Sequence, residues 1–292
     1  MENKELVAQL IDALMDRGFA HADDGNPEAA IADFTEVLKL DPDSEQACFF
    51  RAMMHSRLNE LDLAIADYTR LLELAPNDAD AYIQRGVAFS KKGAPDPAIA
   101  DYNRLNPVFA WAYTSRAFAY YNLGELDRAI EDYTAAIKFS PAFAAWAYSG
   151  RGVALARKGA LDLAIADYTT AIAQDPAFET TYFNRGSAYL DRGELDPAIA
   201  DFTKAIDLNP SYAVAYNGRG AAHFRKGNFD AAIIDCTRAI NLDCEFAWAY
   251  FYRGAAYLGK GEEELATVEF ELAVLFEPMH ICAQGQLEEM LL

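Results

Sequence analysis

Cysteine is scarce in this chain of 292 residues, which contains four, and their spacing does not fit a zinc site. Cys48, Cys236 and Cys244 stand at positions that hold an aromatic residue or proline elsewhere in the chain's internal pattern. We therefore expect buried or half-buried thiols, which are typical of a reducing compartment.

Basic residues are also few. Lys and Arg total 25 against 45 Asp and Glu, which gives a net charge of −20. Nucleic acid and anionic membranes both favour clustered Lys and Arg, so both are poor partners for this chain. The sequence has neither a signal peptide nor an apolar run long enough to span a membrane. We expect no direct membrane insertion and a cytoplasmic location, or a secreted or periplasmic one if a signal peptide has been removed.

Recognisable catalytic sets are missing as well. No Ser/His/Asp or Cys/His group, phosphate-binding loop or pair of catalytic carboxylates stands out. His21, His55 and His223 share one recurring position that otherwise holds Phe, Tyr or Leu, so they are interpreted as smaller rings in an aromatic position. A metal site would need further converging ligands. The sequence predicts no enzyme activity, no cofactor and no metal.

What the chain does contain is a repeat. Aromatic residues, Gly, Ala and Pro return about every 34 residues, eight times. Two stripes with helical spacing are visible in one unit: Tyr182, Gly186 and Tyr189, then Ala198, Phe202, Ala205 and Leu208. Gly193 interrupts the pattern between the stripes, and Pro210 ends the second one because proline cannot continue a helix. Each unit is predicted to be a helix A, a tight turn, a helix B and a second turn.

This pattern resembles the tetratricopeptide repeat. When each unit is numbered from 1 to 34, position 20 is alanine in every unit: Ala30, Ala64, Ala98, Ala129, Ala164, Ala198, Ala232 and Ala266. Position 8 of helix A is always small: Gly18, Ala52, Gly86, Ala117, Gly152, Gly186, Gly220 and Gly254. The resemblance covers roughly residues 11–280. It implies an all-α, right-handed superhelical solenoid of antiparallel helix pairs, which buries its apolar faces between neighbouring repeats.

The expected organisation is an extension of the first helix, eight repeats and a capping helix. The boundaries are 1–10 for the extension, 11–44, 45–78, 79–109, 110–143, 145–178, 179–212, 213–246 and 247–280 for the repeats, and 281–292 for the cap. Repeat three is short, because Asp101 and Pro107 are six residues apart where Asp67 and Pro76 are nine apart. Losing three residues from a helix rotates the next segment of the chain by about 60°, so we predict an irregular junction between repeats three and four. Ala144 is an extra residue, expected in a loop.

Opposite charges recur with the repeat. Position 7 is Arg17, Arg51, Arg85, Arg116, Arg151, Arg185, Arg219 and Arg253, and position 23 is Asp33, Asp67, Asp101, Asp132, Asp167, Asp201, Asp235 and Glu269. We hypothesise arginine–carboxylate pairs that join helices A and B or adjacent repeats. Ligand binding by these arginines is the alternative.

The resemblance implies that helices A line a concave groove, with ligand contacts from positions 2, 5, 6, 9, 12 and 13. The predicted apolar groove residues are Phe19, Phe49, Met53, Ile83, Val87, Phe118, Tyr121, Phe183, Leu190, Phe224 and Phe251. Basic residues at position 13 form one edge and are expected to bind carboxylates of the ligand: Arg57, Lys91, Arg157 and Arg225. The alternative is that some of these aromatic residues fill the seams between repeats.

One family function is argued against. Members that bind chaperone tails share a carboxylate clamp with Lys at position 5, Asn at position 9 and, in later repeats, Asn at 6 and Lys at 2. Here no position 5 or 2 is Lys and no position 9 is Asn, while Asn184 alone fits position 6.

We therefore predict a protein-interaction scaffold or adaptor that binds a peptide or partner protein in its groove, and that is not of the carboxylate-clamp type. Two alternatives stay open. One is a structural solenoid that self-assembles through its ends, so that a homo-oligomer forms. The other is an accessory subunit of an enzyme or transport complex that binds a small molecule near the irregular junction.

Overall fold

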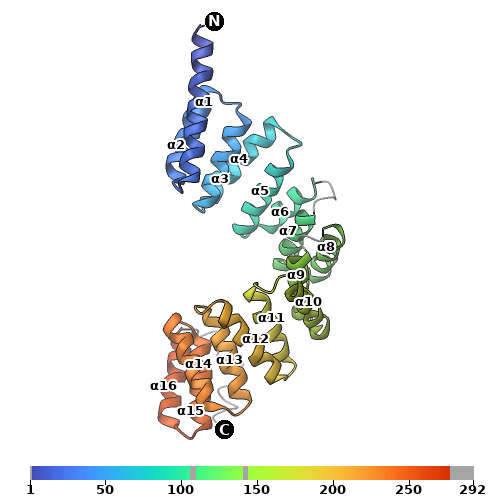
Figure 1. Ribbon diagram of the computed structural model, residues 1–292, viewed down its shortest axis with the longest axis vertical. Helices are drawn as coiled ribbons and strands as arrows, with labels where there is room; N and C mark the ends of the chain where they lie inside the picture. The colour runs from blue at the N-terminus through green and yellow to red at the C-terminus, as the bar shows by residue number, and fades with distance from the viewer. Residues whose placement is uncertain (1, 106–109, 141–143, 277–292) are drawn as a thin grey trace. The chain divides into compact units, whose positions relative to one another are not determined.

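The computed structural model describes residues 2–105, 110–140 and 144–276. In these ranges the regular secondary structure consists of sixteen α-helices, and no strand occurs among the described residues (Figure 1). The chain forms two compact halves, Met1–Phe143 and Ala144–Leu292. In each half, consecutive helices pack side by side, first helix A on helix B of the same repeat and then helix B on helix A of the next. The predicted all-α solenoid of helix pairs is confirmed.

The helices alternate between the A and B type along the chain. In the N-terminal half they are α1 (Glu2–Asp23), α2 (Pro27–Leu40), α3 (Glu45–Arg57), α4 (Leu61–Leu74), α5 (Ala79–Lys91), α6 (Pro95–Tyr102), α7 (Ala110–Asn122) and α8 (Leu126–Phe139). In the C-terminal half they are α9 (Ala144–Arg157), α10 (Leu161–Gln174), α11 (Glu179–Asp191), α12 (Leu195–Leu208), α13 (Ala213–Arg225), α14 (Phe229–Leu242), α15 (Ala247–Gly259) and α16 (Glu263–Phe276).

The core of each repeat forms where helix B packs on the small residue of helix A. A Cβ atom added to Gly18 would lie 2.6 Å from the ring of Phe34, and one added to Gly186 would lie 3.0 Å from the ring of Phe202. Both rings are completely buried. In these repeats position 8 is small because an aromatic ring of helix B occupies the space that a larger side chain would need, and in repeat seven Cys236 Sγ lies 2.7 Å from a Cβ atom added to Gly220.

The turn between helices A and B requires a left-handed residue. Glycine supplies it in seven repeats, for example Gly193 with a φ of 81° and Gly227 with a φ of 81°. In repeat two the residue is Asn59, with a φ of 60°. Asparagine is one of the few residues besides glycine that adopt this conformation at modest cost.

The shortened repeat three loses its residues from helix B. Helix α6 has 8 residues, whereas α2 and α4 have 14 each. Residues 106–109, which precede α7, lie outside the described residues, so the irregular junction stays a prediction. The prediction for Ala144 was wrong. It is the first residue of α9 and is buried, because the extra residue extends helix A at its N-terminal end.

The repeat boundaries stay proposals; apart from the starts of α1 and α9, each helix pair falls within one proposed repeat. Helix α1 has 22 residues and begins ahead of the proposed first repeat. The predicted capping helix over 281–292 lies outside the described residues.

Candidate functional site: the helix A surface and its arginine framework

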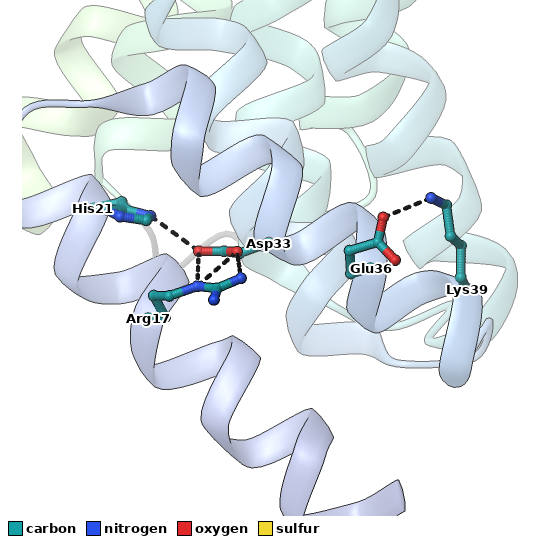
Figure 2. A network of polar contacts seen from close by, with 5 residues as sticks. All are labelled: Arg17, His21, Asp33, Glu36 and Lys39. Carbon is teal, nitrogen blue, oxygen red and sulfur yellow. Dashed lines mark hydrogen bonds and ion pairs between the residues drawn. The ribbon is translucent and has the colours of Figure 1, made fainter.

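In repeat one, the predicted arginine–carboxylate pair forms between Arg17 and Asp33. Figure 2 shows Arg17 of α1 facing Asp33 of α2, with His21 on the other side of the same carboxylate. Arg17 Nε donates to Asp33 Oδ1 at 3.0 Å, and His21 Nδ1 lies 2.9 Å from Asp33 Oδ2. The hydrogen bond from Arg17 is the main reason why the pKa of Asp33 is lowered. The nearby Glu36 and Lys39 form a separate, exposed pair.

The same contact occurs in all eight repeats. The position 7 guanidinium donates from Nε and Nη2 to both oxygens of the position 23 carboxylate, which lies within the same repeat. In repeat seven the distances from Arg219 to Asp235 are 2.8 Å and 2.7 Å. The carboxylates are buried, whereas most of the guanidinium groups are partly exposed. The pairing hypothesis is confirmed, and the pairs join helices A and B.

In repeats two, three, four, six, seven and eight, a third arm of the arginine reaches the preceding repeat. Nη1 donates to a threonine hydroxyl on helix B there, in the pairs Arg51–Thr35, Arg85–Thr69, Arg185–Thr169, Arg219–Thr203 and Arg253–Thr237, at 3.0 to 3.2 Å. In repeat four Asn103 takes the place of threonine, 2.6 Å from Arg116. Sequence reasoning missed this arm, although a threonine two residues after the acid recurs in most repeats. These arginines therefore form a framework within and between repeats, which we call the arginine framework.

Most of the predicted apolar groove residues lie half-buried on helices A. Phe118 is 50% exposed. The half-buried ones are Phe19, Phe49, Met53, Val87, Tyr121, Phe183, Leu190 and Phe224. The prediction was wrong for Ile83 and Phe251, which are 2% and 3% exposed. Phe251 packs against Phe270 of α16 with ring centroids 5.8 Å apart, so the next helix covers it.

The four basic edge residues are exposed, and two of them make equivalent hydrogen bonds to the preceding repeat. Arg57 Nη1 donates to the backbone oxygen of Ala22, and Arg225 Nη1 donates to that of Leu190, both at 3.1 Å. Each arginine thus fixes itself to the end of helix A in the preceding repeat. Carboxylate binding by Arg57, Lys91, Arg157 and Arg225 stays a prediction.

An open hollow of about 500 Å³ lies on the helix A side of repeats seven and eight. It is lined by the ends of α13 and α15 and the start of α14: Phe224, Arg225, Gly227, Phe229, Ala255, Leu258 and Gly259. Phe224 and Arg225 belong to the predicted groove set, and Phe229 was missed because it begins helix B. The structure therefore brings two predicted residues together around one concave site.

The remaining polar candidates lie in or near the core. Burial lowers the pKa of His223, raises the pKa of Cys236 to about 12 and raises the pKa of Cys48. Cys244 is exposed, so the prediction of a buried or half-buried thiol was wrong there. Where the structure describes proline at this position, in repeats one, two, five and six, it is exposed in the turn after helix B.

Metal-binding clusters and membrane spans are both absent from the described part of the chain. Within it, no group of three or more His, Cys, Asp or Glu side chains is arranged to hold a metal ion. Nor does any helix there combine the length and apolarity of a membrane span.

Comparisons with solved structures support the same fold. The chain is similar to the APC/C hetero-tetramer Cut9-Hcn1, with 20% identity and a TM-score of 0.69, over 91% of this chain and 53% of that one. It therefore spans about half the length of that relative. A tetratricopeptide repeat protein from Parabacteroides merdae gives 19% identity and a TM-score of 0.69, over 89% and 99%. MamA gives 28% identity and a TM-score of 0.51, over 56% and 94%.

Family models match most of the sequence, whereas no curated protein matches it. The model described as TPR repeat matches residues 154–191 and 186–227. Models described as tetratricopeptide repeat match residues 15–79 and 51–107, residues 110–143 and residues 213–243. Together with the helix pairs and the recurring arginine framework, these matches place the chain in the tetratricopeptide repeat family.

Proposed function

We propose that this chain is a protein-interaction scaffold that binds a peptide segment of a partner protein along the surface of its helices A. The proposal depends on one observation: apolar side chains at the predicted groove positions are partly exposed on helices that the arginine framework ties to their neighbours. Phe118 is half-exposed, and Leu190 and Phe224 are half-buried. A rigid surface with anchors at set spacings binds at low ordering cost.

The chemistry of this surface favours binding without catalysis. The position 7 arginines of helices A are each paired with a carboxylate on helix B, as in the pair Arg219–Asp235. The sequence lacks the Lys and Asn set of the chaperone-tail clamp, so the proposed ligand is a different class of peptide. The chain has a net charge of −20, so we do not propose nucleic acid as a partner. We propose a cytoplasmic location.

Affinity selection with the full chain tests the proposal. A displayed library of random dodecapeptides is selected on wild-type protein, and dissociation constants of the selected peptides are measured by fluorescence anisotropy. Phe118→Ala is expected to weaken peptides that bind the N-terminal half, and Leu190→Ala those that bind the C-terminal half, by about tenfold, the usual size of a lost anchor. Phe251 is unsuitable for this test, because its side chain is in the core.

The matched control is Leu163→Ala on α10, which removes a side chain that is 60% exposed on helix B. It should leave the dissociation constants unchanged. A selection that enriches no peptide, or peptides that respond to Leu163→Ala and ignore both groove variants, would overturn the proposal.

Self-association through an end of the array is a second candidate, and α1 favours it. Leu6 and Leu10 lie one helical turn apart and are 67% and 49% exposed. Sedimentation of wild type against Leu6→Glu with Leu10→Glu tests it. A wild type that remains monomeric at tens of micromolar contradicts self-association.

A further inference from the structure

We infer that the hollow at repeats seven and eight is an anchor site that takes one aromatic or long aliphatic side chain of a bound peptide, with an Asp or Glu next to that side chain. The inference rests on the proposed function and names the class of peptide that the C-terminal half would recognise. Three features of the hollow support it: the small residues of repeat eight, the aromatic lining, and the positive charge of Arg225.

Repeat eight contributes two small residues to the lining of the hollow. Position 9 is Ala255, and position 13 is Gly259, whereas repeat three has Val87 and Lys91 at these positions. A Cβ atom on Gly259 would lie 2.5 Å from Cζ of Phe229. The Phe229 ring therefore takes the space that a side chain at position 13 would need, and it lines the hollow together with Ala255 and Gly259.

The walls are apolar and aromatic. The ring centroids of Phe224 and Phe229 lie 6.0 Å apart at an angle of 43°, and Leu258 completes the lining. Phe224 and Leu258 also pack against the core cluster around Phe251, which holds them in place. Fixed aromatic walls suit an apolar anchor, because burying a large side chain in a preformed pocket is the usual source of binding energy at an interface.

The charge at the rim comes from Arg225. Two lysines that adjoin lining residues in the sequence are already paired, Lys226 with Asp196 and Lys260 with Asp230, the latter at 2.8 Å. Arg225 is exposed, donates one N–H to the Leu190 carbonyl, also hydrogen-bonds to the side chain of Tyr252, and takes part in no ion pair found among the described residues. A ligand carboxylate would supply the counter-charge in a charge-assisted hydrogen bond.

The strongly negative chain limits how acidic the ligand can be. A net charge of −20 repels an extended run of Asp and Glu, so the fitting peptide carries one carboxylate beside its anchor and is otherwise neutral or basic. The openness of the hollow also matters. A free small molecule usually needs most of its surface enclosed, whereas a side chain on a longer peptide gains further contacts along helices A.

The test uses dodecapeptides selected on the full-length protein, then synthesised with both ends blocked. Wild type is expected to enrich an aromatic or long aliphatic residue with Asp or Glu within two positions. Arg225→Glu is expected to weaken these peptides by at least about tenfold and to prefer the same peptides with Lys in place of the acid. Lys204→Glu, an exposed residue on α12, makes the same charge change away from helices A and should leave the dissociation constants within about twofold.

The outcomes separate this inference from the proposed function. Selected peptides that lack the apolar–acidic pair, or that bind wild type and Arg225→Glu equally while Leu190→Ala weakens them, overturn the inference and leave the proposed function in place. Peptides weakened equally by Arg225→Glu and Lys204→Glu report only net charge and also overturn it. If a blocked peptide of residues 281–292 competes for the hollow and Leu291→Glu in the full chain strengthens binding of the selected peptides, the chain's own end is the occupant and the inference is wrong.

Discussion

Repeats two and seven are built on the same framework and yet present different surfaces. Arg51 bonds to Asp67 and Thr35 in repeat two just as Arg219 bonds to Asp235 and Thr203 in repeat seven. Distances in the two sets agree within about 0.1 Å, which is close to identical on the scale of hydrogen-bond variation.

The differences between these repeats lie at positions that the framework does not use. The turn residue is Asn59 in repeat two and Gly227 in repeat seven, and helix B begins with Leu61 and Phe229, respectively. Repeat eight, which follows repeat seven, is the one repeat whose helix A carries alanine at position 9 and glycine at position 13, Ala255 and Gly259. The comparison teaches that strictly periodic residues hold the fold, whereas local departures from the pattern create the candidate site.

The largest expected effect comes from breaking the shared framework. Asp67→Ala and Asp235→Ala should each lower the free energy of unfolding by about 3 kcal/mol, at the low end for a buried pair because the arginines are partly exposed. Urea unfolding followed by circular dichroism measures both. Asp235→Asn, which keeps the size and one acceptor oxygen, is the matched control and should lose less. Unequal losses, differing by more than about 1 kcal/mol, would mean that the two frameworks are not equivalent.

A smaller effect is expected from giving repeat eight the residue of repeat three. Gly259→Lys places a Cβ atom against Phe229 and a long side chain over the hollow. It should lower the free energy of unfolding by about 1–2 kcal/mol through overpacking. It should also weaken peptide binding at the hollow by about tenfold.

Asn122→Lys is the control for this swap, since it adds lysine at position 13 of repeat four. A lysine at the end of a helix is favourable, so a change within about 0.5 kcal/mol is expected. Unchanged peptide binding in Gly259→Lys would show that the hollow is not the anchor site.

The next effect is the pH dependence that His223 adds to repeat seven. Burial lowers its pKa from 6.5, partly opposed by Asp235 and reinforced by Arg219 and Lys226. Because the folded state favours the neutral ring, its contribution to stability is complete above pH 6.5 and is lost as the pH falls below that value. His223→Tyr, which carries the residue of repeats six and eight, should show a shallower loss of unfolding free energy between pH 7.5 and pH 5.5. Identical slopes in both proteins would contradict the assignment.

Most of the fold was predictable from the sequence because each packing position recurs eight times, once in every repeat. The small residue at position 8, the alanine at position 20 and the pair Arg185–Asp201 were all found in this way. Periodicity alone did not predict how deeply the side chains at one position are buried in different repeats. Ile83 and Phe251 occupy position 5 like the half-buried Phe183, but their neighbours cover them completely.

The hollow was not predictable for a related reason. It depends on the simultaneous presence of small residues on one helix, Ala255 and Gly259, and an aromatic residue at the start of another, Phe229. A repeat pattern describes what the repeats have in common, so it does not predict a site made by residues that differ between repeats. Ala144 illustrates the same limit, because an inserted residue can enter a loop or lengthen a helix, and only the packing that buries it decides.

The smallest expected effect concerns the turn residue that distinguishes repeat two. Asn59 adopts a φ of 60°, where a side chain costs energy that glycine avoids. Glycine loses more entropy on folding, which offsets part of the gain, so Asn59→Gly should raise the free energy of unfolding by about 0.5 kcal/mol. The reciprocal Gly227→Asn should lower it by a similar amount, and Gly227→Ala should lower it further because alanine tolerates this conformation less well than asparagine. Paired urea titrations of the three variants resolve the order. If Asn59→Gly proves less stable than wild type, the asparagine side chain contributes contacts to repeat two that outweigh its backbone cost, and the two turns differ by more than their conformational strain.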